Sequence, residues 1–483
     1  MTAKLPNFIP LIPEIFVLVM TCVTLLMGLF LGKRFKNISY YLVQFTLIIA
    51  AWLTWHVFMK YDFDATVLSF YNMFVLDKLA VVLKSFIYLS AFLTFLYSRQ
   101  YNNDRNIPSN EFYVLGLLSV MGMMILVSGH NLLTIYLGLE LLSLPIYAMV
   151  ALQRSKPRCI EAAMKYFIVG AIASGMLLYG MSMIFGASQS LDITQIDQFI
   201  AGTPVNENIV FIFGLVFLMA GIAFKLGAAP FHMWVPDVYD GAPNSVTLFI
   251  ASAPKIAAFG LVIRLLTQGM PELHIQWQHV WIVISILSMA IGNLVAIVQT
   301  NIKRLLAYSS IAHMGYMILG LVCATPRGNA AALFYIISYT VMTLASFGMI
   351  LLMSRQGFEA NELNDFKGLN SRNPWLAFLM LIVMFSMAGI PPLVGFIAKV
   401  GVLEALIKVH LVWLAVVAIL FAIIGAYYYI RVVKLMYFED AAEDAKPVRY
   451  PLDMNIAISL NGIAVLLLGI FPGALFALSH LTF

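Results

Sequence analysis

The residues that could carry out chemistry in this 483-residue chain are lysines that lie inside long apolar runs. A lysine near the centre of a membrane helix costs about 2.5–3.5 kcal/mol to insert. Such a residue normally faces protein or water and marks a path for ions or protons. The chemistry indicated is therefore proton transfer. The lysines inside apolar runs are Lys78, Lys84, Lys165, Lys225, Lys255 and Lys399.

These lysines differ in depth. Lys78 and Lys84 fall in the first turns of their run, where Asp77 is adjacent and a long side chain can extend to the membrane surface. We interpret these two as snorkelling residues, with a functional role as the alternative. Three lysines lie deeper in their runs and are the candidate proton-transfer residues: Lys225, Lys255 and Lys399.

Glu140 is the carboxylate that lies well inside an otherwise apolar run. Alone in hydrocarbon it would take up a proton, because burial disfavours its charged form. Beside a lysine, either group can hold the charge, so the pair can store and release a proton. A static ion pair between helices is the alternative. For Glu161 and Lys165, which are four residues apart, a local pair on one helix is a stronger alternative.

Three other residues could support a relay. His232 and His313 have side chains whose ordinary pKa suits proton transfer between waters, although a hydrogen-bonded structural histidine is equally consistent with the sequence. Lys303 and Arg304 begin an apolar run and are interpreted as membrane-surface anchors, with a supporting relay role for Lys303 as the alternative. The run 427–434, Tyr-Tyr-Tyr-Ile-Arg-Val-Val-Lys, resembles an aromatic belt and is given no chemistry.

Two of the apolar runs contain an interruption close to a lysine. Residues 225–237 include Pro230 and Pro236, and residues 388–395 include Gly-Ile-Pro-Pro. Proline removes a backbone donor and clashes with the preceding turn, so each stretch should break its helix. Broken helices in the two halves of a transporter point to its translocation site. A simple proline kink is the alternative for either break.

The composition describes the protein that must position these residues. Apolar residues make up 62% of the chain and charged residues 11%, whereas soluble proteins have about 25% charged residues. A water-soluble enzyme is therefore excluded.

The net charge of +5 comes from short loops and forms no basic stripe that would bind nucleic acid. Cys22, Cys159 and Cys323 are isolated, and the sequence shows neither metal-ligand spacing nor a nucleotide-binding motif. We expect no metal and no cofactor in this chain.

Apolar runs separated by charged, proline or glycine residues predict an all-α polytopic membrane protein of fourteen spans, with spans 7 and 12 broken. The expected spans are 10–31, 38–59, 76–97, 111–128, 131–153, 160–186, 208–240, 244–268, 278–299, 302–323, 328–353, 374–409, 411–437 and 454–480.

The basic residues of the loops predict the orientation. Odd-numbered loops hold 17 lysines and arginines, and the termini with the even-numbered loops hold 5, among them Arg264. The positive-inside rule then places the odd loops in the cytoplasm and both termini on the outer side. The first span is interpreted as a retained helix and not as a signal peptide, because its basic cluster follows the apolar stretch.

Three stretches together resemble the antiporter-like subunits of respiratory complex I, the NADH:quinone oxidoreductase. They are residues 225–243 (KLGAAPFHMWVPDVYDGAP), 299–316 (QTNIKRLLAYSSIAHMGY) and 386–399 (SMAGIPPLVGFIAK). The resemblance covers nearly the whole chain. One departure is Ser245, where the family often has proline.

The resemblance implies two inverted five-helix repeats, built from spans 4–8 and 9–13. The expected segments are 1–110 with helices 1–3, 111–269 with the first repeat, 270–438 with the second repeat, and 439–483 with a loop and helix 14.

The resemblance also implies a proton path. Glu140 would pair with Lys225, Lys255 would receive the proton, and Lys399 would pass it outward. The supporting relay would consist of His232, His313, Lys165, Glu161 and Lys303. Subunit M, a close relative within the family, carries glutamate at the position of Lys399.

By the same resemblance, the partners would be other complex I subunits, with subunits M and K as direct neighbours. NADH, FMN, iron–sulfur clusters and quinone would be bound in partner subunits. The location would be a bacterial inner membrane, with both termini on the periplasmic side, and an organelle membrane is the alternative.

A subunit of a multi-subunit sodium/proton antiporter shares the fold and the lysines and is the alternative function. A structural scaffold is disfavoured because it would have no reason to retain deep ionisable residues.

Overall fold

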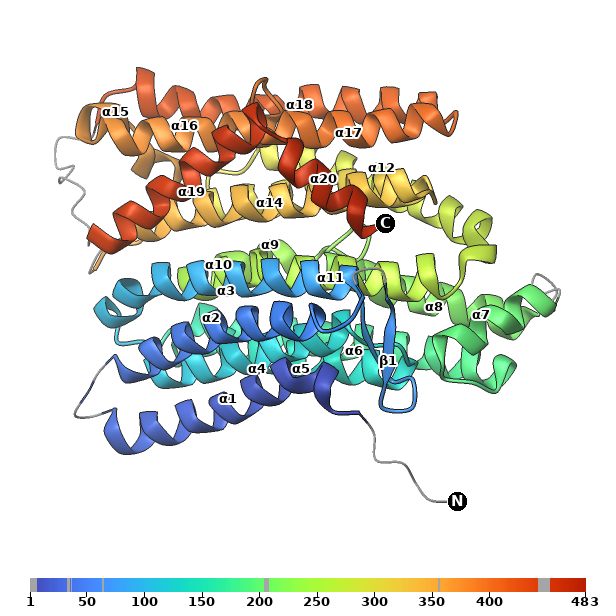
Figure 1. Cartoon of the computed structure of the whole chain (residues 1–483). Coiled ribbons are helices and arrows are strands. Elements are labelled where there is room, and N and C mark those ends of the chain that lie inside the picture. Colours follow the sequence, from blue (N-terminus) through green and yellow to red (C-terminus); the bar gives the residue numbers. More distant parts are fainter. Residues whose placement is uncertain are drawn as a thin grey trace. The chain divides into compact units, whose positions relative to one another are not determined.

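The computed structural model describes residues 7–32, 35, 37–62, 65–203, 208–354, 357–441 and 452–483. Helices dominate this part of the chain, and one short antiparallel hairpin accompanies them (Figure 1). In the hairpin, β1 (Val67–Ser69) pairs with β2 (Phe74–Leu76), with Leu68 opposite Val75. The fold is all-α, as the apolar runs predict.

The chain divides into two compact units. Unit 1 comprises the residues up to Phe95, Ile107–Lys225 and Ala253–Trp277, and unit 2 comprises Leu96–Asn106, Leu226–Ser252 and Gln278–Phe483. The four segments expected from the sequence, with their two repeats, stay a prediction.

The described helices that begin in unit 1 include three irregular ones, a 3₁₀-helix before α1, a π-helix after α11 and a 3₁₀-helix before α12. They are η1 (Ile9–Leu11), α1 (Ile12–Leu31), α2 (Ile38–Phe58), α3 (Lys78–Asp104), α4 (Ser109–Val127), α5 (Leu132–Val150), α6 (Pro157–Ser188), α7 (Ile193–Gly202), α8 (Ile209–Leu226), α11 (Ala253–Val262), η3 (Ile263–Gln268), η4 (Pro271–Leu273) and α12 (His274–Ile297).

The helices of unit 2 surround two that are almost entirely buried, α13 and α14. They are α9 (Trp234–Gly241), α10 (Asn244–Ala251), α13 (Ile302–Val322), α14 (Pro326–Met353), η5 (Leu363–Phe366), α15 (Leu369–Arg372), α16 (Pro374–Ala388), α17 (Val394–Lys408), α18 (Val412–Phe438), α19 (Leu452–Ile470) and α20 (Gly473–Thr482).

Thirteen helices of the described chain are long and apolar enough to cross a membrane. The expected span 374–409 is divided between α16 and α17, each of 15 residues. The expected single span 454–480 is wrong in detail: α19 ends at Ile470 and α20 begins at Gly473. Pro472 lies between them, and its ring cannot continue the preceding helix. The total of fourteen crossings stays a prediction.

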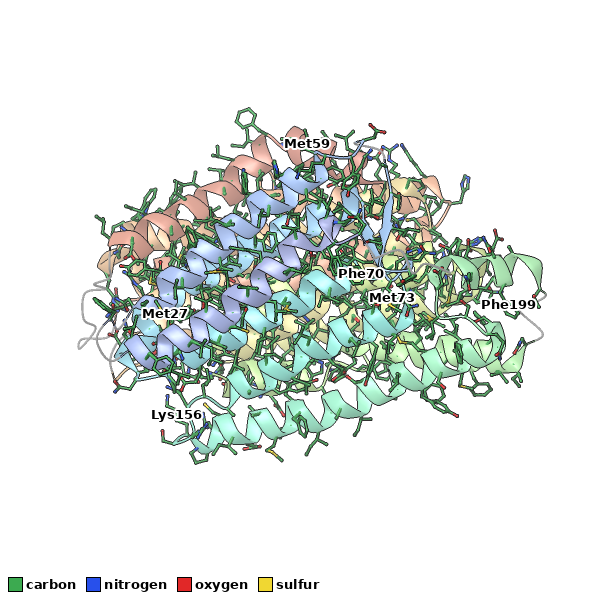
Figure 2. The ribbon with its side chains drawn as sticks, turned by 60° about the horizontal axis from the view of Figure 1, so that its bottom comes forward. Met27, Met59, Phe70, Met73, Lys156 and Phe199 are labelled. Atoms are coloured by element: carbon green, nitrogen blue, oxygen red, sulfur yellow. The ribbon has the colours of Figure 1, made fainter. Side chains whose placement is uncertain are left out.

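Large apolar side chains cover the outside of the helices, as lipid contact requires. Met59, at the end of α2, is 70% exposed, and Figure 2 shows it and Met27 of α1, at separate places, among many projecting side chains. Phe30 of α1 is 80% exposed and Val298, after α12, is 71% exposed. A soluble monomer rarely exposes a contiguous apolar surface of this extent. The distribution of apolar residues therefore agrees with a multi-pass membrane protein.

Side-chain caps define where several helices begin. The Asn301 side chain accepts hydrogen bonds from the backbone N–H groups of Lys303 and Arg304, at 2.9 and 3.1 Å, and so starts α13. Asn131 starts α5 in the same way. Asn373 does so for α16, whose first residue, Pro374, has no N–H to satisfy. These caps fix the register of the helices that carry His313 and Glu140.

Candidate functional site

Lys225 lies in the last turn of α8, next to the point where span 7 breaks. The helix ends at Leu226, Gly227 adopts a left-handed conformation with φ +70°, and helix resumes only at Trp234. In unit 1 the Lys225 Nζ donates a hydrogen bond of 2.7 Å to Ser143 Oγ on α5. The Ser143 hydroxyl in turn donates to the Leu139 carbonyl at 2.6 Å. The lysine at the first break is thus tied to α5.

Glu140 lies three residues before Ser143 on α5, so both side chains project from one face of the helix. The Glu140 carboxylate interacts electrostatically with Lys225. The hydrogen-bond acceptor of Lys225 is nevertheless Ser143, and Glu140 Oε1 is buried with no hydrogen-bond partner in the described part of the chain. Glu140 and Lys225, on α5 and α8, therefore interact with no hydrogen bond between them among the described residues, and their role as a proton-transfer pair stays a prediction. Ser143 was missed because a serine in an apolar helix has no distinguishing sequence signal.

Lys255 lies in the first turn of α11 and is 2% exposed. It follows a third helix break that the sequence analysis missed. Ser252 separates α10 from α11 with φ −112° and ψ −93°, and its hydroxyl donates to the carbonyls of Leu248 and Phe249. Pro254 supplies the signal that could have found this break, because the residue before a proline is disfavoured in α-helix. Each deep lysine therefore lies beside a helix break.

Lys399 on α17 reaches back across the break of span 12. Its Nζ donates to the carbonyls of Met387 and Ala388, at 3.2 and 2.9 Å, which are the last residues of α16. A cation at the carboxyl end of a helix is favourable, since the unpaired carbonyls carry partial negative charge. The next residue, Gly389, has φ +88°, and a Cβ built there would lie 3.0 Å from Lys399 Cδ. Glycine is required there for both backbone conformation and space.

His313 on α13 is the centre of a buried hydroxyl network in unit 2. Its Nδ1 lies 2.7 Å from the Tyr335 hydroxyl and its Nε2 lies 3.1 Å from the Tyr429 hydroxyl. Tyr429 also makes a short hydrogen bond with Ser309, and His313 interacts electrostatically with Lys399. Hydroxyl groups both donate and accept, so this network can pass a proton on. Tyr429 belongs to the run interpreted as an aromatic belt, and that interpretation is wrong for this residue, which is 2% exposed.

Lys303 and Arg304 hold α9, the short helix after the first break. Lys303 Nζ donates to the carbonyls of Asp240 and Ala242, at 2.9 and 2.8 Å, where α9 ends. Arg304 pairs with Asp237 at 3.1 Å. Lys303 is 2% exposed, so its interpretation as a membrane-surface anchor is wrong, and its bonds hold the end of α9.

The remaining expected residues lie away from the contacts described above. Glu161 and Lys165 form a 2.8 Å pair on α6 and are 65% and 47% exposed, so the structure keeps them on an outer face. An exposed pair of this kind is worth at most about 1 kcal/mol. His232 lies in the turn between α8 and α9, where its carbonyl accepts from Val235 N–H at 2.9 Å.

Two buried ion pairs in unit 1 were not predicted. Lys84 is fully buried, with its Nζ 2.5 Å from Glu14 Oε1, so the snorkelling interpretation is wrong for this lysine. Arg264, which was assigned to a loop, lies in the π-helix η3 and is 1% exposed. Its guanidinium makes two hydrogen bonds to the Asp77 carboxylate, at 2.6 and 2.7 Å. Distant partners of this kind leave no local pattern in a sequence.

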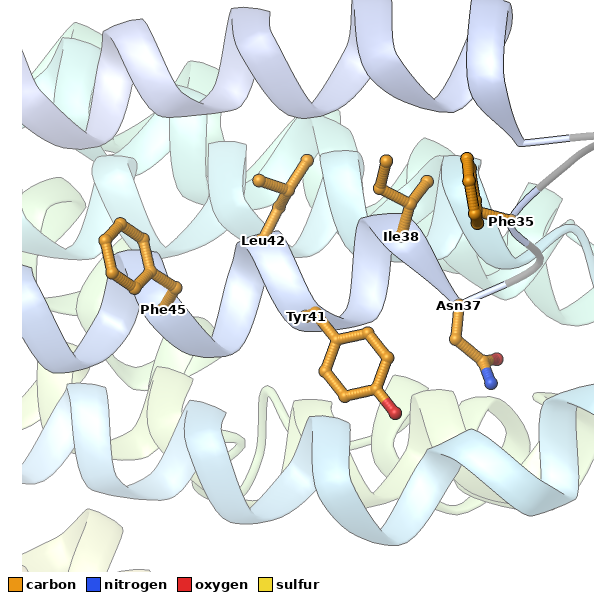
Figure 3. Close-up of a pocket in the computed structure, with 6 residues that line it drawn as sticks. All are labelled: Phe35, Asn37, Ile38, Tyr41, Leu42 and Phe45. Carbon is orange, nitrogen blue, oxygen red and sulfur yellow. The ribbon is translucent and has the colours of Figure 1, made fainter.

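An open groove of about 740 Å³ lies along the first turns of α2 (Figure 3). Among the residues that the structure describes, the lining contains neither lysine, carboxylate nor histidine, and the groove includes none of the candidate residues. The lining residues are Phe35, Asn37, Ile38, Tyr41, Leu42 and Phe45.

Comparison with known proteins identifies the family of this chain. Residues 129–425 match the family described as NADH:quinone oxidoreductase/Mrp antiporter, transmembrane. The chain is 66% identical over 483 residues to a Coxiella burnetii protein named NADH-quinone oxidoreductase subunit N, covering 100% of both chains. It is 53% identical to the Thioalkalivibrio sulfidiphilus protein of the same name, with 99% of each chain covered.

Solved structures share the fold. A chain of respiratory complex I from Thermus thermophilus with bound aureothin is similar with a TM-score of 0.81 and 30% identity, over 96% of this chain and 99% of that one. A chain of the Mrp complex from Dietzia sp. DQ12-45-1b has a TM-score of 0.85 at 18% identity, over 97% and 96%, which shows a common fold. This chain belongs to the subunit N family of NADH-quinone oxidoreductase, whose members are antiporter-like membrane proteins.

Proposed function

We propose that this chain is the proton-translocating membrane subunit of an NADH-quinone oxidoreductase, and that it moves protons while partner subunits carry out the electron transfer. The observation that carries this proposal is the recurrence of one arrangement: Lys225, Lys255 and Lys399 each lie beside a helix break. Irregular backbone at membrane depth persists where protein or a water-filled cavity satisfies its polar groups. Breaks beside buried cations are typical of translocation sites.

The described contacts suggest a different role for each residue along the proton path. Glu140 and Lys225 act as the loading pair, with Ser143 holding the lysine in place. Lys255 receives the proton. The His313 network and Lys399 then release it, since His313 bonds two hydroxyls and interacts with Lys399. Lys303 acts by fixing α9. His232, Glu161 and Lys165 are supporting residues, and the exposure of Glu161 and Lys165 in this chain fits a contact with a neighbouring subunit.

The remaining expectations belong to the same proposal. NADH, FMN, iron–sulfur clusters and quinone are bound by partner subunits, in keeping with isolated cysteines and the lack of a nucleotide-binding motif in this sequence. The direct neighbours are subunits M and K. The chain resides in the bacterial inner membrane with both termini on the periplasmic side, because basic residues concentrate in the odd-numbered loops.

A sodium/proton antiporter subunit is the second candidate, favoured by the fold shared with the Mrp complex chain. Purification of the tagged chain in mild detergent separates the two functions. Co-isolation with flavin- and iron–sulfur-containing subunits, and with NADH:quinone activity, is the result expected here. Co-isolation with partners that carry no redox centre would support the antiporter instead.

A further inference from the structure

The Glu14–Lys84 ion pair is a buried titratable pair that the proposed path does not use. Glu14 lies in the first turn of α1 and Lys84 in the second turn of α3, with 2.5 Å between Oε1 and Nζ. Their side chains are 5% and 0% exposed. Removing two charges from water costs several kcal/mol for each ion. A pair this fully enclosed within lipid-facing helices therefore needs an explanation.

The surroundings of the pair are largely apolar. The Phe74 ring lies with its centroid 4.9 Å from Lys84 Nζ, and Phe74 packs in a core cluster with Val57, Phe58, Leu76 and Val81. Glu14 Oε2 has no hydrogen-bond partner in the described part of the chain. Few polar groups therefore surround the pair to stabilise its charged form. A short move of the proton, which breaks a Nζ–H bond of Lys84 and forms an O–H bond on Glu14, turns the ion pair into a neutral amine and a neutral acid.

Lys84 belongs to a line of polar residues along α3, formed by Asp77, Lys84 and Tyr88. Asp77 lies seven residues before Lys84, about two helical turns away on the same face, and interacts electrostatically with it. Tyr88 lies one turn beyond Lys84, where its hydroxyl is 3.1 Å from Thr54 Oγ1, and Tyr88 interacts electrostatically with Glu14. The line therefore runs from Tyr88 through Lys84 to Asp77, at the start of the helix.

The line ends at a half-exposed histidine. Arg264, which is bonded to Asp77, and Asp77 itself both interact electrostatically with His130. His130 lies between α4 and α5, outside the membrane-spanning helices, and its ring nitrogen Nε2 is 2.9 Å from Oγ1 of Thr194 in α7. Arg264 lies in a π-helical turn, a local geometry that is frequent at functional sites.

From this arrangement we infer that Glu14 and Lys84 form a further proton-transfer site, which exchanges a proton with the aqueous face where α1 and α3 begin. The inference rests on the proposed function, because it assumes that this subunit moves protons. The Glu14, Lys84, Asp77 and Arg264 charges sum to zero, so one added proton gives the cluster a single positive charge. The alternative is a static bond that holds α1 to α3.

Substitutions that separate the two roles are available. Lys84→Arg keeps a cation beside Glu14, but a guanidinium does not give up its proton in proteins. Glu14→Gln/Lys84→Met removes both charges while keeping similar volumes, and such replacements of buried pairs are often neutral or stabilising. A matched control is Arg99→Gln/Asp453→Asn, which removes the exposed 2.5 Å pair from the same helix, α3.

The experiment measures protons pumped per NADH oxidised by the assembled complex in inverted membrane vesicles. Lys84→Arg and the neutral double variant should lose more than half of the wild-type ratio, and the control double variant should keep it. The exchanged pair Glu14→Lys/Lys84→Glu retains both titratable groups and should pump better than the neutral double variant. Wild-type ratios in both Lys84→Arg and the neutral double variant would overturn the inference. If the neutral double variant does not assemble, Lys84→Arg alone decides the result.

A Lys225→Met complex in the same series tests the proposed function separately. Impaired pumping by Lys225→Met together with normal pumping by Lys84→Arg rejects only the inference about Glu14 and Lys84. Normal pumping by Lys225→Met rejects the proposed function itself.

Discussion

Lys225 donates its hydrogen bond to Ser143, one helical turn along α5 from Glu140, and not to Glu140 itself. The ammonium is therefore held by a neutral hydroxyl while the carboxylate acts on it from a distance. An arrangement of this kind leaves Glu140 able to gain or lose a proton without breaking the hydrogen bond of Lys225. In a direct ion pair, a change in the protonation of Glu140 would also break the hydrogen bond of Lys225.

Replacement of Ser143 tests that relationship. A hydrogen bond to a charged group contributes about 1.5–3 kcal/mol, so Ser143→Ala should displace Lys225 and reduce proton pumping several-fold in an assembled complex. Ser143→Thr keeps the hydroxyl and should pump close to the wild-type rate. Equal pumping by the alanine and threonine variants would show that the hydroxyl does not position Lys225.

A methyl group at Gly389 should displace Lys399. With φ +88° and Lys399 Cδ only 3.0 Å from a built Cβ, Gly389→Ala meets both backbone strain and a clash. The left-handed conformation costs an L-residue roughly 1–2 kcal/mol. Gly357→Ala is the matched control, because Gly357 has φ +77° but no atom of the described residues lies within 4 Å of its built Cβ. Pumping should fall in Gly389→Ala and persist in Gly357→Ala, and equal losses in both would attribute the effect to strain alone.

The hydroxyls around His313 are expected to be functional. Tyr429→Phe removes the hydroxyl that bonds His313 Nε2 and leaves the ring volume unchanged. We expect reduced pumping with normal assembly. Tyr427→Phe provides the control on the same helix, since Tyr427 is 60% exposed. If proton uptake by vesicles is identical for Tyr429→Phe and Tyr427→Phe, the network is structural.

His130 should make stability depend on pH. Burial lowers the pKa of His130 below its ordinary value, so the unfolded chain binds this proton more readily than the folded chain. The contribution to stability is fully present above the ordinary pKa of about 6.5 and is lost as the pH falls towards the lowered pKa. Between about pH 7.5 and pH 5.5, wild-type complex should lose more thermal stability than a His130→Gln complex, as measured by heat inactivation. Parallel losses in the two complexes would contradict this assignment.

Sequence reasoning located the residues that conflict with their surroundings. Lys225 and Lys399 stood out because a cation in an apolar run needs an explanation, and glycine and proline beside them indicated the breaks. The partners of these lysines could not be found in this way. Ser143, Tyr335 and Tyr429 are ordinary residues of apolar helices, and only tertiary packing shows that they bond Lys225 and His313.

Long-range ion pairs were missed for a related reason. Lys84 and Glu14 are 70 positions apart in the sequence, and Arg264 and Asp77 are 187 apart. Burial of such charges depends on which helices pack together, which hydropathy alone does not determine. The amphipathic helix α7 could have been found, because Ile193, Ile196 and Ile200 lie on one face after a capping Asp192.

The most direct test of the account is proton pumping per NADH oxidised in membrane vesicles whose assembled complex carries Lys225→Met. Matched vesicles with Lys408→Met, an exposed lysine at the end of α17 that the proposed path does not use, serve as the control. We predict that Lys225→Met loses most of the wild-type ratio while Lys408→Met keeps it. A fully assembled Lys225→Met complex that pumps at the wild-type ratio would contradict the central claim that Lys225 carries the translocated proton.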